Sequence, residues 1–263
     1  MFKIPATALP APDLALLAGL QSNVDSIGSY PQAVAEGKRL WDTKPKLLFT
    51  GIRDLLKKMC SGNTRCIYCE DSLADEIEHM RPKSLYPEAV FVWGNYVLAC
   101  GTCNNPKNNK FAVIDTSTGN LVVVTRKRKD VVQAPLAGQS ALIDPRAEDP
   151  LDYLWLDFIT WRYVPIHESG VNLLRAQFTI NVLGLNVRDE FLRGRCSAFS
   201  GFKARLETYC SHAAVWTQAQ RDAFVADFRV ERYRTVWLEM IRQRSARPDL
   251  DGLLTQAPAA LAW

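Results

Sequence analysis

Four cysteines form the clearest chemical pattern in this chain. Cys66 and Cys69 make one Cys-x-x-Cys pair, and Cys100 and Cys103 make a second. Four thiolates in tetrahedral geometry form a closed structural zinc site. In a reducing compartment such pairs indicate metal ligands rather than disulfides. The sequence therefore predicts a structural Zn²⁺ ion, which suits binding modules and enzymes alike.

A Glu-His pair between the two cysteine pairs indicates a second, catalytic chemistry. Glu78 directly precedes His79. A histidine is the natural general base for water near neutral pH, and a carboxylate suits a hard cation such as Mg²⁺. Phosphodiester hydrolysis needs both groups. Adjacent residues of a regular strand point to opposite faces, so we expect the strand to end or twist here, which Pro82 favours.

Polar residues at defined positions around the second cysteine pair strengthen this interpretation. Asn95 precedes the pair, and Asn104 directly follows Cys103 in the first turn of an expected helix. The amide oxygen of Asn104 could bind a metal while zinc holds the neighbouring Cys103. Lys107 lies one turn further along the helix, near the same face, and could contact a substrate phosphate. Lys83, four residues after His79, is the second expected phosphate contact.

The combined pattern C-x-x-C, [DE]-H-x-x-P-x-S and N-x-x-L-x-C-x-x-C-N-x-x-K resembles the HNH endonuclease family, of the ββα-metal (treble-clef) class. The resemblance implies that His79 is the general base and that Asn95 orients it. It also implies that Glu78 and Asn104 bind a catalytic Mg²⁺ or Mn²⁺ ion, with Asn108 as a less favoured substitute for Asn104. The acidic ligand is Glu rather than the commoner Asp, so its reach differs by one methylene.

A narrower resemblance concerns HNH proteins encoded beside ATPases in bacterial anti-phage systems, the Septu PtuB-like group with its retron-associated members. It is carried by IEHMRPKSLYPE, by W-x-N-Y-x-x-A-C-G-x-C-N-x-P-K-N-N, and by the later LIDPRAEDP and LGLN-x-R. The specific motifs cover residues 64–111, and the similarity over 140–200 is looser. This resemblance implies a defence effector with a PtuA-like ATPase partner and a nucleic-acid substrate, DNA rather than RNA.

Composition places the chain among ordinary globular proteins. It has 263 residues, 48% of them hydrophobic and 23% charged, and a net charge of only +4, which is weak evidence for a polyanionic partner. No apolar run approaches the roughly 18 residues that span a bilayer. Prolines interrupt the N-terminal apolar stretch, so we expect no signal peptide and a cytoplasmic protein. Cys60, Cys196 and Cys210 are interpreted as core thiols, with Cys60 as a reserve zinc ligand.

Hydrophobic periodicity predicts the elements that must position these residues. The expected helices cover 12–25, 31–42, 45–60, 173–184, 186–210 and 218–246. The expected strands cover 96–99, 121–125, 155–159 and 161–165, the last two as a possible hairpin. Pro248 is expected to end the last helix, and TQAPAALAW to be a loosely held tail.

These elements predict an α+β, mainly helical fold. A zinc-stabilised ββα-metal core with adjoining strands, residues 64–139, would lie between an N-terminal helical region, 1–63, and a mainly helical C-terminal region, 140–263.

Two further features leave the function open. The basic run from Arg126 to Lys129 suits a phosphate backbone and a solvated loop equally well. A zinc-stabilised module that binds nucleic acid or protein without catalysis is the alternative function. The Glu78, His79, Asn95 and Asn104 set argues against this alternative, because a pure binder needs none of them in that arrangement.

Overall fold

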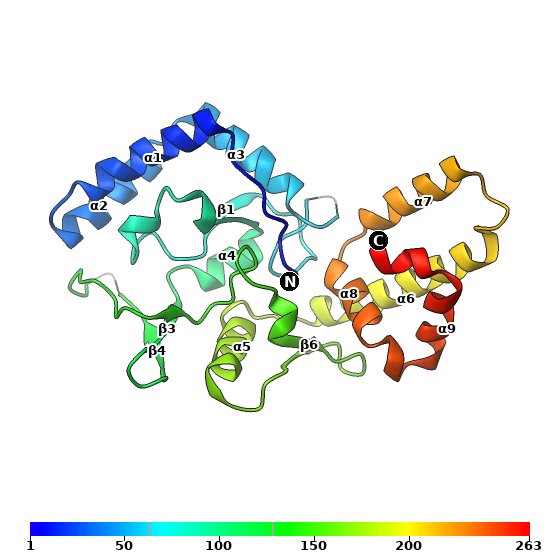
Figure 1. Ribbon diagram of the computed structural model, residues 1–263. Coiled ribbons are helices and arrows are strands. Elements are labelled where there is room, and N and C mark those ends of the chain that lie inside the picture. The colour runs from blue at the N-terminus through cyan, green and yellow to red at the C-terminus, as the bar shows by residue number, and fades with distance from the viewer. Residues whose placement is uncertain (63, 128) are drawn as a thin grey trace.

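The computed structural model describes residues 1–62, 64–127 and 129–263. Helices dominate and small sheets accompany them, so the predicted α+β, mainly helical class is confirmed. Figure 1 shows α1–α3 along one side of the molecule, β1 and α4 beneath them, and α6–α9 gathered at the opposite end. None of the helices in the described part is long and apolar enough to cross a membrane.

Three helices open the chain close to their predicted bounds. They are α1 (Ala11–Asp25), α2 (Tyr30–Asp42) and α3 (Lys46–Lys58). The amphipathic stripe of α3 buries Ile52 and Leu56, and this helix packs on β2. This packing places the N-terminal helices against the strand that leads to the second cysteine pair.

A ββα unit follows the first cysteine pair. The strands β1 (Glu76–His79) and β2 (Tyr96–Ala99) pair antiparallel, with His79 opposite Tyr96, and α4 (Gly101–Lys107) starts directly after Cys100. Two short 3-10 turns, Pro87–Ala89 and Trp93–Asn95, lie in the connection between the strands. Every residue of β2 is buried, as expected for a strand covered on both faces.

Two small sheets come next. The first has the order β4-β3-β5, formed by β3 (Phe111–Ile114), β4 (Leu121–Val124) and β5 (Gln139–Ser140), which confirms the strand predicted at 121–125. The second pairs β6 (Leu154–Leu156) with β7 (Tyr163–Pro165) antiparallel, so the predicted hairpin is confirmed with shorter strands.

Two helices follow, α5 (Gly170–Val182) and α6 (Asp189–His212), where 173–184 and 186–210 were predicted; α5 packs on β3 and β7, and α6 packs on α8 and α9. Gly184 separates them with a positive φ of 61°, a left-handed conformation that glycine adopts without strain. The predicted interruption at this glycine is therefore confirmed.

The single long helix predicted over 218–246 is wrong. The chain instead forms α7 (Gln218–Arg229), α8 (Arg234–Arg242) and a 3-10 turn (Arg244–Ala246). In one straight helix Phe228 and Trp237 would be separated by about 13 Å along the axis, yet their ring centroids lie 4.8 Å apart. A reversal at Tyr233, which has a φ of 62°, brings the two aromatic rings together. Tertiary contact between apolar side chains therefore overrides the local helical pattern.

The end of the chain also differs from its predicted structure. Pro248 starts α9 (Pro248–Gln256) instead of ending a helix, which suits the first helical position because the missing N–H has no intrahelical acceptor there. The supposed tail forms a 3-10 helix (Pro258–Ala262), and Trp263 is only 6% exposed. Its ring lies 4.7 Å from that of Tyr209 and 4.9 Å from that of Phe228. The C-terminal segment therefore closes an aromatic cluster.

Replacing Trp263 with alanine is expected to destabilise the protein by about 3–5 kcal/mol, because a buried aromatic side chain is removed from packed neighbours. Chemical denaturation of the full chain measures this loss. Leu261→Ala is the matched control, since Leu261 is 40% exposed. Equal denaturation midpoints for the two variants would contradict a contribution of Trp263 packing to the stability of the protein.

Candidate functional site

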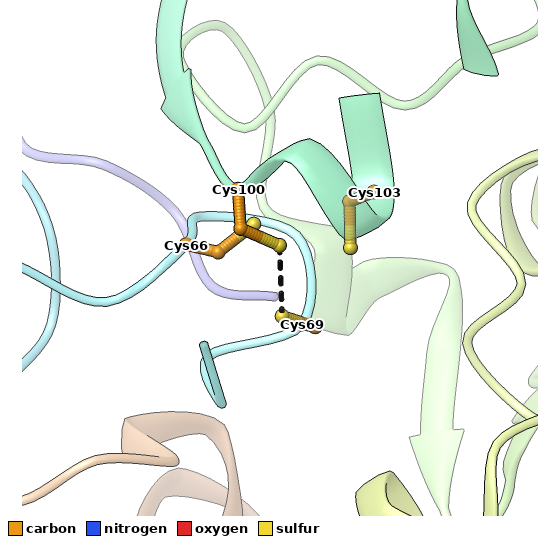
Figure 2. Close-up of side chains that lie close together, drawn as sticks. All are labelled: Cys66, Cys69, Cys100 and Cys103. Carbon is orange, nitrogen blue, oxygen red and sulfur yellow. Dashed lines mark hydrogen bonds between the residues drawn. The ribbon is translucent and has the colours of Figure 1, made fainter. Parts of the chain in front are cut away.

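The four cysteine thiols meet at one buried point. Their Sγ atoms all lie within 4.8 Å of one another, and the Cys69 and Cys100 sulfurs are 3.9 Å apart. Figure 2 shows the four side chains converging from two segments. Cys66 and Cys69 come from the loop 66–69, here called the first knuckle, and Cys100 and Cys103 come from the start of α4. A tetrahedral zinc ion with bonds of about 2.3 Å would hold its sulfurs about 3.8 Å apart. The cluster therefore suits a structural zinc ion.

Backbone hydrogen bonds bring the two pairs together. Ile67 N donates to Leu98 O at 3.1 Å, which joins the first knuckle to β2, and Cys103 N donates to Cys100 O at 3.0 Å in the first turn of α4. Burial raises the pKa of the Cys66 thiol. Zinc would overcome this effect, because coordination deprotonates a thiol. The Cys60 sulfur lies outside the cluster and contacts Leu56 O at 3.4 Å, as expected for a core thiol.

Two acidic residues fasten the first knuckle to the C-terminal helices. Glu70 Oε2 accepts from Thr235 N at 3.0 Å, and Asp71 Oδ1 accepts from the Tyr233 hydroxyl at 2.9 Å. Glu70 is fully buried with a φ of 59°. Neither contact was predicted, and the only signal in the sequence is the position of the two acids directly after a Cys-x-x-Cys pair. They join the zinc centre to α8.

His79 is the last residue of β1, at the strand end that the sequence analysis expected. Its Nε2 lies 3.0 Å from Val90 O, and the Tyr96 hydroxyl donates to the same oxygen at 2.6 Å. A carbonyl oxygen only accepts hydrogen bonds, so Nε2 carries the proton and Nδ1 keeps its lone pair. Burial lowers the pKa of His79 to about 3. The imidazole is therefore neutral at neutral pH, the form that a general base requires.

Two aromatic rings hold the imidazole plane. Trp41 of α2 lies 4.3 Å from the His79 ring, centroid to centroid, and Tyr96 lies 5.1 Å from it, both nearly edge-on. His79 is 4% exposed as a result. Trp41 lies in a helix with no motif around it, so no local signal in the sequence pointed to this role.

The Glu78 side chain faces α4. Its carboxylate forms an ion pair with the Lys107 ammonium, which is 0% exposed and also donates to His79 O at 3.1 Å. Burial raises the pKa of Glu78, and the Lys107 charge acts in the opposite direction. The structure thus brings the Glu78 carboxylate and the backbone carbonyl of His79 to the Lys107 ammonium, which is directed inward.

Asn104 lies one turn before Lys107 on the same face of α4. Its Nδ2 donates to Glu76 Oε2 at 2.6 Å, so Glu76 and Glu78 on β1 face Asn104 and Lys107 on α4. Carboxylate and amide oxygens are the ligands that Mg²⁺ and Mn²⁺ prefer, and a metal on Glu78 would have to displace the Lys107 ammonium. This donor set fits a divalent cation. Asn108 is exposed and has a φ of 41°.

Comparison with known proteins agrees with this geometry. Residues 66–110 match the HNH endonuclease family. They form an HNH endonuclease domain. The Septu protein PtuB from Bacillus thuringiensis is 40% identical over 51 residues, a stretch that makes up 18% of this chain and 20% of PtuB. The similarity thus spans about a fifth of each protein.

Asn95 holds the connection between the two strands of the HNH domain. Its Oδ1 accepts from Arg81 N at 2.8 Å, and its Nδ2 donates to Arg81 O at 3.0 Å and to Ala89 O at 2.9 Å. Ala89 immediately precedes Val90, the acceptor of His79 Nε2. Asn95 therefore holds the backbone next to Val90, and among the described residues its hydrogen bonds go to backbone groups and not to the imidazole.

Asn95→Ala is expected to destabilise the HNH domain by about 1–3 kcal/mol, because buried backbone groups lose their partners. Nucleic-acid cleavage should fall by about 100-fold if the Val90 carbonyl moves. Thermal unfolding and a cleavage time course measure the two effects. Asn23→Ala, on the exposed face of α1, is the control. An Asn95→Ala variant with parental stability and parental cleavage would show that the hydrogen bonds of Asn95 to Arg81 and Ala89 are not needed.

Lys83, the remaining expected phosphate contact, lies close to Arg126, the first residue of the basic run. Lys83 is half-buried, and its Nζ lies 5.6 Å from the centroid of the Trp41 ring. Arg126 donates a hydrogen bond to Ser84 O, next to Lys83. Arg128, in the same basic run, lies outside the described residues.

Proposed function

We propose that this chain is an endonuclease that hydrolyses nucleic-acid phosphodiester bonds with His79 as general base and one divalent cation. The supporting observation is the state of His79. Its Nε2–H is held by Val90 O, so its Nδ1 lone pair is left for a proton. The match of residues 66–110 to the HNH endonuclease family supports the same chemistry.

In this mechanism His79 Nδ1 removes a proton from the attacking water. The Val90 carbonyl accepts the Nε2–H bond throughout, so it holds the ring orientation and stabilises the imidazolium that forms. Trp41 and Tyr96 restrict rotation of the ring. Glu78 and Asn104 would hold Mg²⁺ or Mn²⁺, which when bound stabilises negative charge on the phosphate and the leaving oxygen. Lys83 is the expected phosphate contact, and Lys107 would become one only by leaving Glu78.

A cleavage assay across double-stranded DNA, single-stranded DNA and tRNA, with Mg²⁺ or Mn²⁺, tests the proposal. We expect cleavage of DNA that is lost when the metal is chelated. Cleavage of tRNA alone would redirect the substrate to structured RNA. Equal cleavage with and without chelator would contradict the metal-dependent mechanism.

The alternative is a zinc-stabilised binding module without catalysis. Two observations favour it: His79 is 4% exposed, and Lys107 pairs with the Glu78 carboxylate that a metal would need. Metal-dependent nicking of plasmid DNA separates the two functions. Binding without nicking, at any concentration of either metal, would support the module.

We further propose that the protein is a cytoplasmic effector of an anti-phage defence system, activated by an ATPase partner. The short match to the Septu protein PtuB supports this role, as do the motifs at 142–150 and 183–188. Affinity purification from the native host should recover an ATPase, and deletion should raise phage plating efficiency. An isolated chain with full activity and no ATPase partner would count against the role.

A further inference from the structure

Two ammonium groups lie near the His79 site, one from the corner between α2 and α3 and one from the connection between β1 and β2. Lys44 Nζ lies 4.4 Å from the centroid of the Trp41 ring, and Lys83 Nζ lies 5.6 Å from the same centroid. The Trp41 ring lies 4.3 Å from that of His79. Lysines from two separate regions therefore converge on one indole that touches the proposed base.

Carboxylates lie near these two lysines but none of the described residues forms a direct ion pair with them. Within residues 1–62, 64–127 and 129–263, neither Lys44 nor Lys83 forms an ion pair. Two acids lie nearby. Asp42 is exposed and forms no ion pair with either lysine in the described part of the chain, and Glu78 is paired with Lys107. The only hydrogen bond that Lys44 Nζ makes in this part of the chain is to Trp41 O, at 3.0 Å.

Holding the two ammonium groups partly buried costs free energy. Burial lowers the pKa of both lysines, and each lowers the pKa of His79. The face of the indole offsets part of the cost through cation–π attraction. A bound anion would offset the rest, and lysine is an effective point-charge ligand for phosphate.

We propose that Lys44 and Lys83, held on Trp41, form a binding site for a backbone phosphate of the nucleic acid next to His79. This proposal rests on the proposed phosphodiester chemistry. The recognised group is a phosphodiester, found in DNA and RNA alike. The nuclease site then extends beyond residues 66–110, because Trp41 and Lys44 belong to the N-terminal helices.

The test uses the full chain carrying His79→Ala, so that bound nucleic acid is not cut. Lys44→Gln removes the charge and keeps most of the stem over Trp41, and Lys46→Gln is the matched control at an exposed lysine nearby. Fluorescence anisotropy with a labelled DNA duplex and, separately, a labelled tRNA gives affinities at several salt concentrations. Lys44→Gln is expected to weaken binding roughly 10- to 100-fold. The slope of log affinity against log salt should become shallower by about 0.9 for duplex DNA.

A merely structural role for Lys44 predicts a different result. If the charge matters, Lys44→Arg restores the affinity and the slope. A loss of affinity with unchanged slope, or no rescue by arginine, would overturn the phosphate site. So would a Lys44→Gln protein that binds like Lys46→Gln, or no binding to either nucleic acid at low salt.

The same experiment separates this proposal from the nuclease itself. If the chain with His79 intact cuts nucleic acid but Lys44→Gln changes neither binding nor KM, the phosphate site fails and the function stands. If binding depends on Lys44 but no variant cuts, the hydrolysis fails and the phosphate site stands. The comparison of duplex DNA with tRNA shows which backbone the site accepts.

Discussion

Replacing His79 with alanine is expected to lower phosphodiester cleavage by about 10²- to 10⁴-fold, the usual contribution of a positioned general base. The variant has no Nδ1 lone pair to accept the proton from water. Zinc content should stay unchanged, because the four thiols contact one another while the imidazole contacts Val90 O. Initial rates on plasmid DNA, with zinc measured by mass spectrometry, check both parts.

The burial of His79 makes a stability control necessary. The substitution leaves a small cavity beside Trp41 and Tyr96, so part of any loss could come from unfolding. His79→Gln fills more of the space and has no ring nitrogen that could accept a proton. His212→Ala controls for loss of a histidine as such, since His212 is exposed. A folded His79→Gln protein that cuts at the parental rate would disprove the general-base role.

Replacing Cys66 with serine is expected to abolish stoichiometric zinc binding and to unfold the HNH domain. Metal ligation of a small ββα unit contributes on the order of 10 kcal/mol to folding, more than the net stability of most domains. The hydrogen bond from Ile67 N to Leu98 O, which aligns the knuckle with β2, should be lost as well. Bound zinc, circular dichroism and hydrogen exchange over residues 64–111 measure the effect.

The matched control for this prediction is Cys196→Ser. Cys196 is a half-buried thiol on α6, outside the four-cysteine cluster, so its loss should leave zinc content unchanged. Because Glu70 and Asp71 fasten the knuckle to Thr235 and Tyr233, loosening should extend to α8 in Cys66→Ser. A Cys66→Ser protein with one zinc ion per chain and parental thermal stability would be incompatible with a zinc-dependent fold.

Local sequence information was sufficient for the first helices and for the zinc ligands. The apolar stripe of α3 and the spacing within each Cys-x-x-Cys pair are patterns that extend over only a few residues. Such short patterns can be recognised from the sequence alone. The order of Glu78, His79, Asn95 and Asn104 likewise identified the residues that the structure gathers around β1, β2 and α4.

Contacts between distant segments decided the rest. The helical period over 218–246 gave no sign of the reversal at Tyr233, because the rings of Phe228 and Trp237 stabilise the turn only once the chain has folded back. The prediction of a loosely held tail was wrong for the same reason, because the aromatic rings of α6 and α7 on which Trp263 packs lie far from it along the chain.

The sequence by itself determined which residues can do chemistry, and the tertiary structure decided the state in which they are held. Spacing along the chain predicted His79 as a base and Glu78 as a metal ligand. Only the fold supplies Val90 O, which sets the tautomer of His79, and Trp41, which covers its ring. The physical reason is that hydrogen bonds and burial depend on distance in space, and the sequence records only distance along the chain.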